Sequence, residues 1–198
     1  MIGRSGEYLK MVMYTIFCLM LVVSSYTIIL NIHHYKSLSN IIAVSEIDSD
    51  YSKYKENVVL IEEKLNNHSN SSDKLYISLE KTANYMKKSG VFRLVPKAKL
   101  TYKDLYELND YFIEELINNC WIHSIKELDI SIKYQEVINM LVNNSNYINS
   151  IFTNNSLILY DDTLDNKIAD NYHFILKNYL MYSNVILNLC NELGGENG

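Results

Sequence analysis

The side chains that could do chemistry are spread along the chain without the spacing of a known catalytic or metal site. The five histidines are His33, His34, His68, His123 and His173. None of them belongs to an HExxH or Glu-x-x-His motif, the patterns that zinc enzymes and helical metal sites use. The chain also lacks a GxSxG motif and a glycine-rich phosphate loop. We therefore expect no enzyme activity, no metal site and no cofactor.

One segment of the chain is basic, although the chain as a whole is acidic. Between Lys81 and Lys103 every charged residue is basic, and Val91, Phe92, Leu94 and Val95 lie among them. One interpretation is a contact surface for an anionic partner, such as lipid headgroups, an anionic wall polymer or an acidic protein. The expected contact residues are Lys87, Lys88, Arg93, Lys97, Lys99 and Lys103. The alternative is a crossing segment that buries its apolar side chains while its lysines face acids near Asp161–Asp170.

The three cysteines allow two arrangements. Cys18 lies in an apolar stretch, where a small thiol is unremarkable. Cys120 and Cys190 could form a disulfide if their part of the chain is exported. The alternative is that they are two separate buried thiols.

The stretch Met11–Leu30 contains no charge, Gly or Pro. It is long enough to span the roughly 30 Å hydrocarbon core of a bilayer and longer than a typical signal-peptide core. We expect a cytoplasmic head at 1–10 and an uncleaved transmembrane signal anchor at 11–32. Arg4 and Lys10 precede the stretch and Lys36 follows it, which favours a cytoplasmic N-terminus and an external C-terminal domain.

The turn residues indicate an all-α protein. No Gly or Pro occurs between Gly6 and Gly90, or between Pro96 and Gly194. An all-β chain would need such residues every eight to twelve positions or so. The predicted fold is an N-terminal single transmembrane helix followed by a four- to five-helix antiparallel bundle at 33–195, with a tail at 196–198. Within it, 89–100 is expected to form an irregular basic crossing loop, with a short strand at 91–95 considered.

Apolar residues at spacings of three and four predict the helices. They cover 41–67, 73–88, a third segment from Thr101 to about 122, 131–154, and a last helix ending before Gly194. Thr101 and Asp104 match a capping arrangement, and a bend is expected near 124–130. No breaker separates the anchor from the heptad stripe that ends at Leu65. The two could form one rod, with Ser37–Asn40 as its weakest point.

The net charge of the chain argues against one class of function, nucleic-acid binding. The net charge is −5, of which residues 1–36 carry +2, leaving −7 for the remainder. An acidic domain argues against non-specific nucleic-acid binding. We expect a membrane-anchored interaction or accessory protein on the cell membrane, partnered by another membrane or envelope protein and able to oligomerise through heptad helices. The alternative is a sensor-like bundle that holds a small molecule near Trp121, Tyr172 and Tyr179. Its architecture is similar to that of helical extracytoplasmic parts of bacterial sensors.

Overall fold

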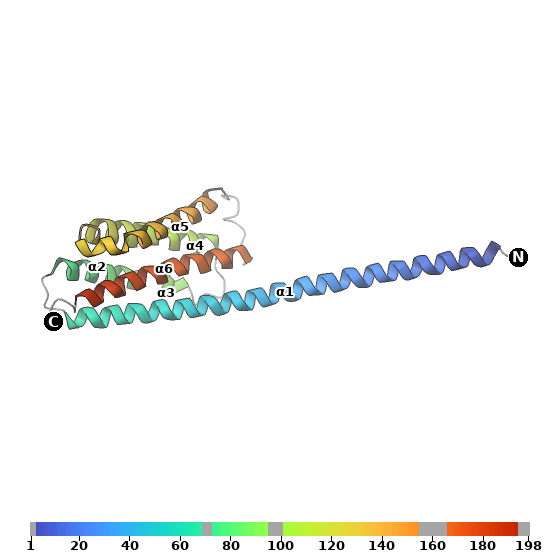
Figure 1. Cartoon of the computed structure of the whole chain (residues 1–198), viewed down its shortest axis with the longest axis horizontal. Helices are drawn as coiled ribbons and strands as arrows, with labels where there is room; N and C mark the ends of the chain where they lie inside the picture. Colours follow the sequence, from blue (N-terminus) through green and yellow to red (C-terminus); the bar gives the residue numbers. More distant parts are fainter. Residues whose placement is uncertain (1–2, 69–72, 95–100, 155–165, 194–198) are drawn as a thin grey trace. The chain divides into compact units, whose positions relative to one another are not determined.

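The computed structural model describes the backbone of residues 3–68, 73–94, 101–154 and 166–193, and side chains within these ranges. The chain divides into two compact units, residues 1–42 and 43–198. Every regular element in the described ranges is helical, which confirms the all-α prediction (Figure 1).

The first unit is formed by the N-terminal part of helix α1 (Gly3–Asn67). Its residues 11–31 have a mean hydropathy of 2.1, and none of this stretch is buried. By length and composition this stretch could cross a membrane. The hydroxyls of Thr15 and Thr27 donate to the carbonyls of Met11 and Val23 at 2.9 and 2.8 Å. Both polar groups are thus satisfied within the helix. Helical assignment continues through 37–40, where the sequence placed the weakest point.

The second unit contains the C-terminal part of α1 and seven further elements. These are α2 (Lys74–Lys88), α3 (Val91–Leu94), α4 (Tyr102–Tyr111), the π-helix η1 (Phe112–Ile125), the 3₁₀-helix η2 (Asp129–Tyr134), α5 (Gln135–Asn154) and α6 (Asn166–Glu192). In Figure 1, α4, α5 and α6 lie side by side, and each contacts the other two. Helix α2 packs against η1.

Helix α6 supplies the centre of the core. Its fully buried side chains recur at the predicted three- and four-residue spacing and include Tyr172, Ile175, Tyr179, Tyr182, Ile186 and Leu189. The Tyr179 ring lies edge-on to Phe112 at 5.0 Å and to Tyr54 at 5.6 Å, measured between ring centroids. The tyrosines of α6 at positions 172, 179 and 182 are therefore core residues.

Tyrosine hydroxyls tie the helices together through backbone carbonyls. Tyr179 donates to the Leu108 carbonyl and Tyr182 to the Leu116 carbonyl, both at 2.8 Å. These bonds join α6 to α4 and to η1. The Tyr54 hydroxyl reaches the carbonyl at the end of α2, on Met86, at 3.2 Å. Each of these three hydroxyls is buried and has a hydrogen-bond partner.

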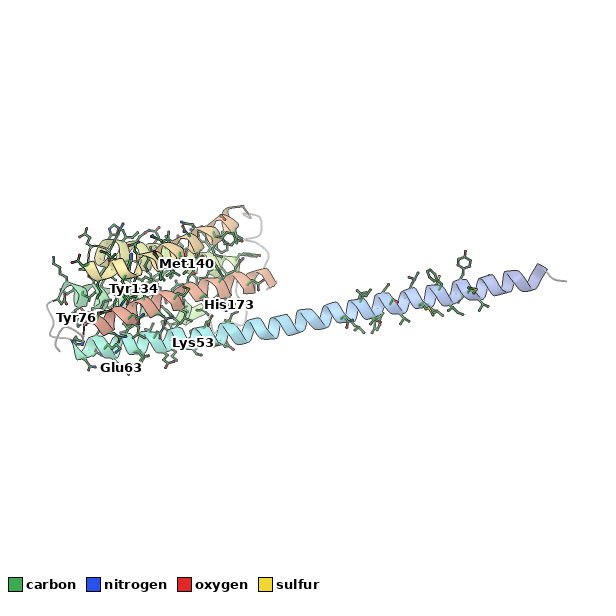
Figure 2. The ribbon with its side chains drawn as sticks, viewed as in Figure 1. Lys53, Glu63, Tyr76, Tyr134, Met140 and His173 are labelled. Atoms are coloured by element: carbon green, nitrogen blue, oxygen red, sulfur yellow. The ribbon has the colours of Figure 1, made fainter. Side chains whose placement is uncertain are left out.

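A polar contact also joins α6 to the C-terminal part of α1. His173 Nε2 lies 3.1 Å from Asp50 Oδ2, and both side chains are largely buried. Figure 2 shows His173 on α6. Because this contact spans 123 positions of sequence, periodicity within either helix could not have predicted it.

The predicted third helix changes type partway along its length. Its start is as expected: Thr101 and Asp104 form a complete capping box. From Phe112, however, the backbone is a π-helix, and the Lys126 N–H donates to the Trp121 carbonyl five residues earlier at 2.7 Å. The buried residues of η1 are Phe112, Leu116, Ile117, Cys120, Trp121 and Ile125, and among them Phe112, Leu116, Trp121 and Ile125 follow one another at spacings of four, five and four. An α-helix completes three turns in about eleven residues, so the wider turn is what brings both Trp121 and Ile125 to the core.

Two other boundaries correct the sequence predictions. A strand was considered at 91–95, but Val91–Leu94 forms the short helix α3. Val91 is buried there and Phe92 packs against Tyr51 and Tyr54. The fourth helix was expected from Ser131, yet the chain first forms η2 and enters α5 only at Gln135. Residues 155–165, between α5 and α6, and the rest of the crossing segment, 95–100, lie outside the described residues.

A layer of buried polar side chains joins α4, α5 and α6. Asn109 Nδ2 donates to the Ser145 carbonyl at 3.0 Å and to Asn149 Oδ1 at 2.7 Å. Asn178 Oδ1 accepts from Asn144 Nδ2 at 3.1 Å, and Asn178 Nδ2 lies 3.5 Å from Ser145 Oγ. Because a shift of any one helix would leave buried amides unpaired, this layer favours a single register among the three.

The structure places Cys120 and Cys190 as separate, buried, free thiols, the second of the two arrangements considered above. Burial raises the pKa of Cys120 to about 11 and that of Cys190 to about 12. A buried thiol that stays protonated is a poor nucleophile, so neither thiol is set up as a reactive group.

A thiol count tests this arrangement. Purified without reductant and unfolded in guanidinium, the chain should expose three thiols to an Ellman-type reagent, because all three cysteines are free. In the folded protein Cys120 and Cys190 should react far more slowly than in the unfolded protein. One reactive thiol after unfolding would instead mean that Cys120 and Cys190 are linked.

Candidate interaction surface

Helix α2 has one buried side and one basic outer side. Leu75, Tyr76, Leu79 and Met86 are buried against the core. The outer row consists of Lys74, Ile77, Lys81, Asn84 and Lys88, all exposed, and is called the α2 face below. Its three lysines are seven residues apart, so they lie along one stripe of the helix.

The α2 face is basic in an acidic unit. Helix α2 has four lysines and one acid, Glu80. Lys87, beside the face, forms an ion pair with Glu62 of α1. Among the described residues, Lys74 and Lys88 have no assigned ion pair. Within the part of the unit that the structure describes, the α2 face therefore keeps lysines that no assigned ion pair neutralises.

An exposed apolar residue interrupts these lysines. Ile77 is 55% exposed, although it is a large aliphatic side chain. Two open depressions meet at it. One, of about 340 Å³, runs along α2 and is lined by Ile77, Glu80, Lys81, Asn84, Tyr85 and Lys88. The other, of about 360 Å³, lies between α2 and η1 and is lined by Lys74, Ile77, Ser78, His123, Ser124, Glu127 and Leu128.

Hydrogen bonds near the C-terminal end of η1 hold α2 against η1 beside the second depression. Lys81 Nζ donates to the Asn119 carbonyl at 3.2 Å and to Ser124 Oγ at 3.3 Å. Ser78 Oγ donates to the Ser124 carbonyl at 2.8 Å. A cation at a helix C-terminus also complements the helix dipole. Lys81 is thus both part of the α2 face and a cap for η1.

The residues predicted for an anionic contact are divided among several places. Lys88 belongs to the α2 face, whereas Lys87 is paired with Glu62. Lys103 stands on α4 and lies 3.8 Å from Glu107. Lys97, Lys99 and the side chain of Arg93 lie outside the described residues. The sequence reasoning missed Lys74 and Ile77, although the spacing of Lys74, Lys81 and Lys88 could have identified them.

The residues proposed for a small-molecule site lie in the core. Trp121, Tyr172 and Tyr179 are each at most 1% exposed. Tyr179 uses its hydroxyl on the Leu108 carbonyl, but Trp121 Nε1 and the Tyr172 hydroxyl have no hydrogen-bond partner among the described residues. For metals, no group of three or more His, Cys, Asp or Glu side chains comes together within that same described part.

The two roles of lysine on α2 can be separated by substitution. Lys81→Ala removes the cap of η1 and should lower the free energy of unfolding by about 1 kcal/mol. Lys74→Ala, on the same face, should change it by less than about 0.5 kcal/mol. Thermal unfolding of the full chain in mild detergent, followed by fluorescence of the single buried tryptophan, Trp121, measures both. Equal stability of the two variants would show that Lys81 does not hold η1.

The comparisons with known proteins supply no family for the chain. No protein-family model, no curated protein and no solved structure matches it. Its function is therefore argued from its own residues.

Proposed function

We propose that this chain is a membrane-anchored helical interaction or accessory protein without catalytic activity. In this proposal residues 11–32 span the cell membrane, and the C-terminal unit is an antiparallel bundle held outside the cytoplasm. The observation that carries the proposal is the apolar stretch of α1, because it is long, uncharged and wholly uncovered by protein.

The anchor is supported by the physical chemistry of that stretch. Twenty-one residues of helix span about 31 Å, close to the thickness of a bilayer core. A core helix of similar composition would be covered by neighbouring helices, whereas here 0% is buried. Leaving such a surface in water would be unfavourable by about 25 cal/mol for each Å² of apolar area. A bilayer would remove that cost.

The bundle is supported by the packing of the second unit. Helices α4, α5 and α6 contact one another, and α2 contacts η1, around a single buried apolar cluster. The α2 face is the part of this unit best suited to a partner. It offers positive charge, an amide and one exposed aliphatic side chain, which are contact groups rather than a nucleophile with its base.

The orientation follows from charge near the anchor. Arg4 and Lys10 precede it, and Lys36 follows it. Basic residues favour the cytoplasmic side, so the short head would be inside and the larger unit outside. The partner would then be another membrane or envelope protein. Oligomerisation through the heptad stripe of α1 would compete with the bundle, because Tyr54, Val58, Ile61 and Leu65 of that stripe are buried in its core.

A second candidate is a sensor-like domain that binds a small molecule between its helices. Trp121 Nε1 and the Tyr172 hydroxyl favour it, because these buried atoms have no hydrogen-bond partner within the described ranges and a polar ligand could supply one. The ring contacts of Tyr179 with Phe112 and Tyr54 favour a packed interior instead. We rank the interaction protein first for that reason.

Membrane extraction tests the anchor, and a reporter tests the orientation. The full chain should stay with membranes after carbonate treatment, and a phosphatase fused to its C-terminus should be active. Leu19→Arg/Val22→Arg should release it, because each arginine costs about 3 kcal/mol at the centre of a spanning helix. Release of the unsubstituted chain from membranes by carbonate would contradict the anchor. Fluorescence of a C-terminal cytoplasmic reporter, with an inactive phosphatase, would contradict the external domain.

A further inference from the structure

We propose that the α2 face binds an acidic amphipathic helix of a partner protein in the same membrane. The inference rests on the proposed function for the membrane and goes beyond it in naming the site and the chemistry of the partner. Its starting point is the stripe formed by Lys74, Ile77, Lys81, Asn84 and Lys88.

The spacing of the stripe favours a helical partner. A second helix lying along α2 meets positions that recur at three and four residues, as in helix-in-groove recognition. The lysines occupy every seventh position, and Ile77 and Asn84 occupy the intervening positions of the same heptad register. Ile77 would be the apolar anchor, with the depressions on either side of it receiving side chains of the partner.

The charge of the stripe selects an acidic partner over a second copy of this chain. In a two-fold contact through the α2 face, the lysines of one copy would face the lysines of the other, since such a contact pairs the same patch with itself. That juxtaposition is repulsive. A helix with Glu or Asp at the matching positions replaces this repulsion with attraction.

The acids beside the stripe favour a protein over anionic lipid. Glu80 lines one depression and Glu127 lines the other. A uniformly negative headgroup surface would be repelled by both. A protein helix can place acids opposite Lys74 and Lys88 and neutral or basic side chains opposite the two glutamates.

The size of the face sets the strength of binding. Fifteen residues of α2 give a face about 22 Å long, which is short for a stable interface of about 1,600 Å². Binding through this face alone would be weak and sensitive to salt. Anchoring both proteins in one membrane would raise their effective concentration and make such a contact productive.

Photo-crosslinking in the membrane tests the site. The full chain carries p-benzoylphenylalanine in place of Ile77, and a control carries it in place of Ile132, which is 74% exposed on η2. We expect an adduct at position 77 at least about fivefold stronger than at 132, joined to a peptide that is net acidic and patterned as an amphipathic helix.

Charge reversal tests its chemistry. In the position-77 chain, Lys74→Glu/Lys88→Glu should reduce the adduct about tenfold, from loss of two attractive pairs and gain of two repulsive ones. Lys53→Glu/Lys55→Glu makes the same change in net charge on exposed residues of α1 and should leave the adduct unchanged (Figure 2 labels Lys53). Lys81 is kept in all chains because it caps η1. Circular dichroism must show equal folding of the two double variants.

The possible outcomes distinguish a wrong binding site from a wrong function. An adduct only to lipid or to a second copy, one equally strong at position 132, or one insensitive to reversal of Lys74 and Lys88 would overturn the proposed site. So would the absence of any adduct at position 77. If a partner still co-purifies in detergent in any of these cases, the interaction function stands and only the α2 face is wrong. Failure of the membrane anchor is measured separately by carbonate extraction.

Discussion

The buried tyrosines of α6 are the constraint on which the rest of the second unit depends. Tyr179 and Tyr182 reach the Leu108 and Leu116 carbonyls and so hold α4 and η1 against the same helix. A buried tyrosine hydroxyl usually has a hydrogen-bond partner, and for Tyr179 and Tyr182 that partner is a backbone carbonyl of a neighbouring helix. The same ring of Tyr179 contacts Phe112, at the point where α4 becomes the π-helix. Packing and hydrogen bonding therefore fix the position of η1 together.

The position of η1 in turn determines what α2 can expose. Helix α2 buries one side against η1 and is fastened to its end through Ser78 and Lys81. The exposed row of α2 beside η1 keeps Lys74, Ile77 and Lys88 at the surface. A basic stripe displayed on a well-packed support costs little ordering entropy when a partner binds, because the support is already formed. This links the aromatic core to the proposed interaction.

Sequence reasoning succeeded where a local pattern decides structure. The helical class, the Thr101 capping box, α2 and the buried stripe of α6 all follow from periodicity, caps and missing turn residues. It failed at η1, because Leu116 and Cys120 fit α-helical and π-helical spacing alike and only Trp121 and Ile125 separate the two. It also missed contacts set by tertiary packing, such as His173 with Asp50, and the exposure of Ile77. The basic stretch was recognised, but its lysines are divided between α2 and α4.

The most direct test of this account removes the two hydroxyls of α6 and nothing else. Tyr179→Phe and Tyr182→Phe should each lower the free energy of unfolding of the full chain by about 1 kcal/mol, with Trp121 fluorescence as the probe. The matched controls are Tyr106→Phe and Tyr147→Phe, whose side chains are 45% and 62% exposed and should change stability by less than about 0.5 kcal/mol. If the α6 variants were as stable as these controls, the tyrosine hydroxyls would not be what holds α4 and η1 to α6.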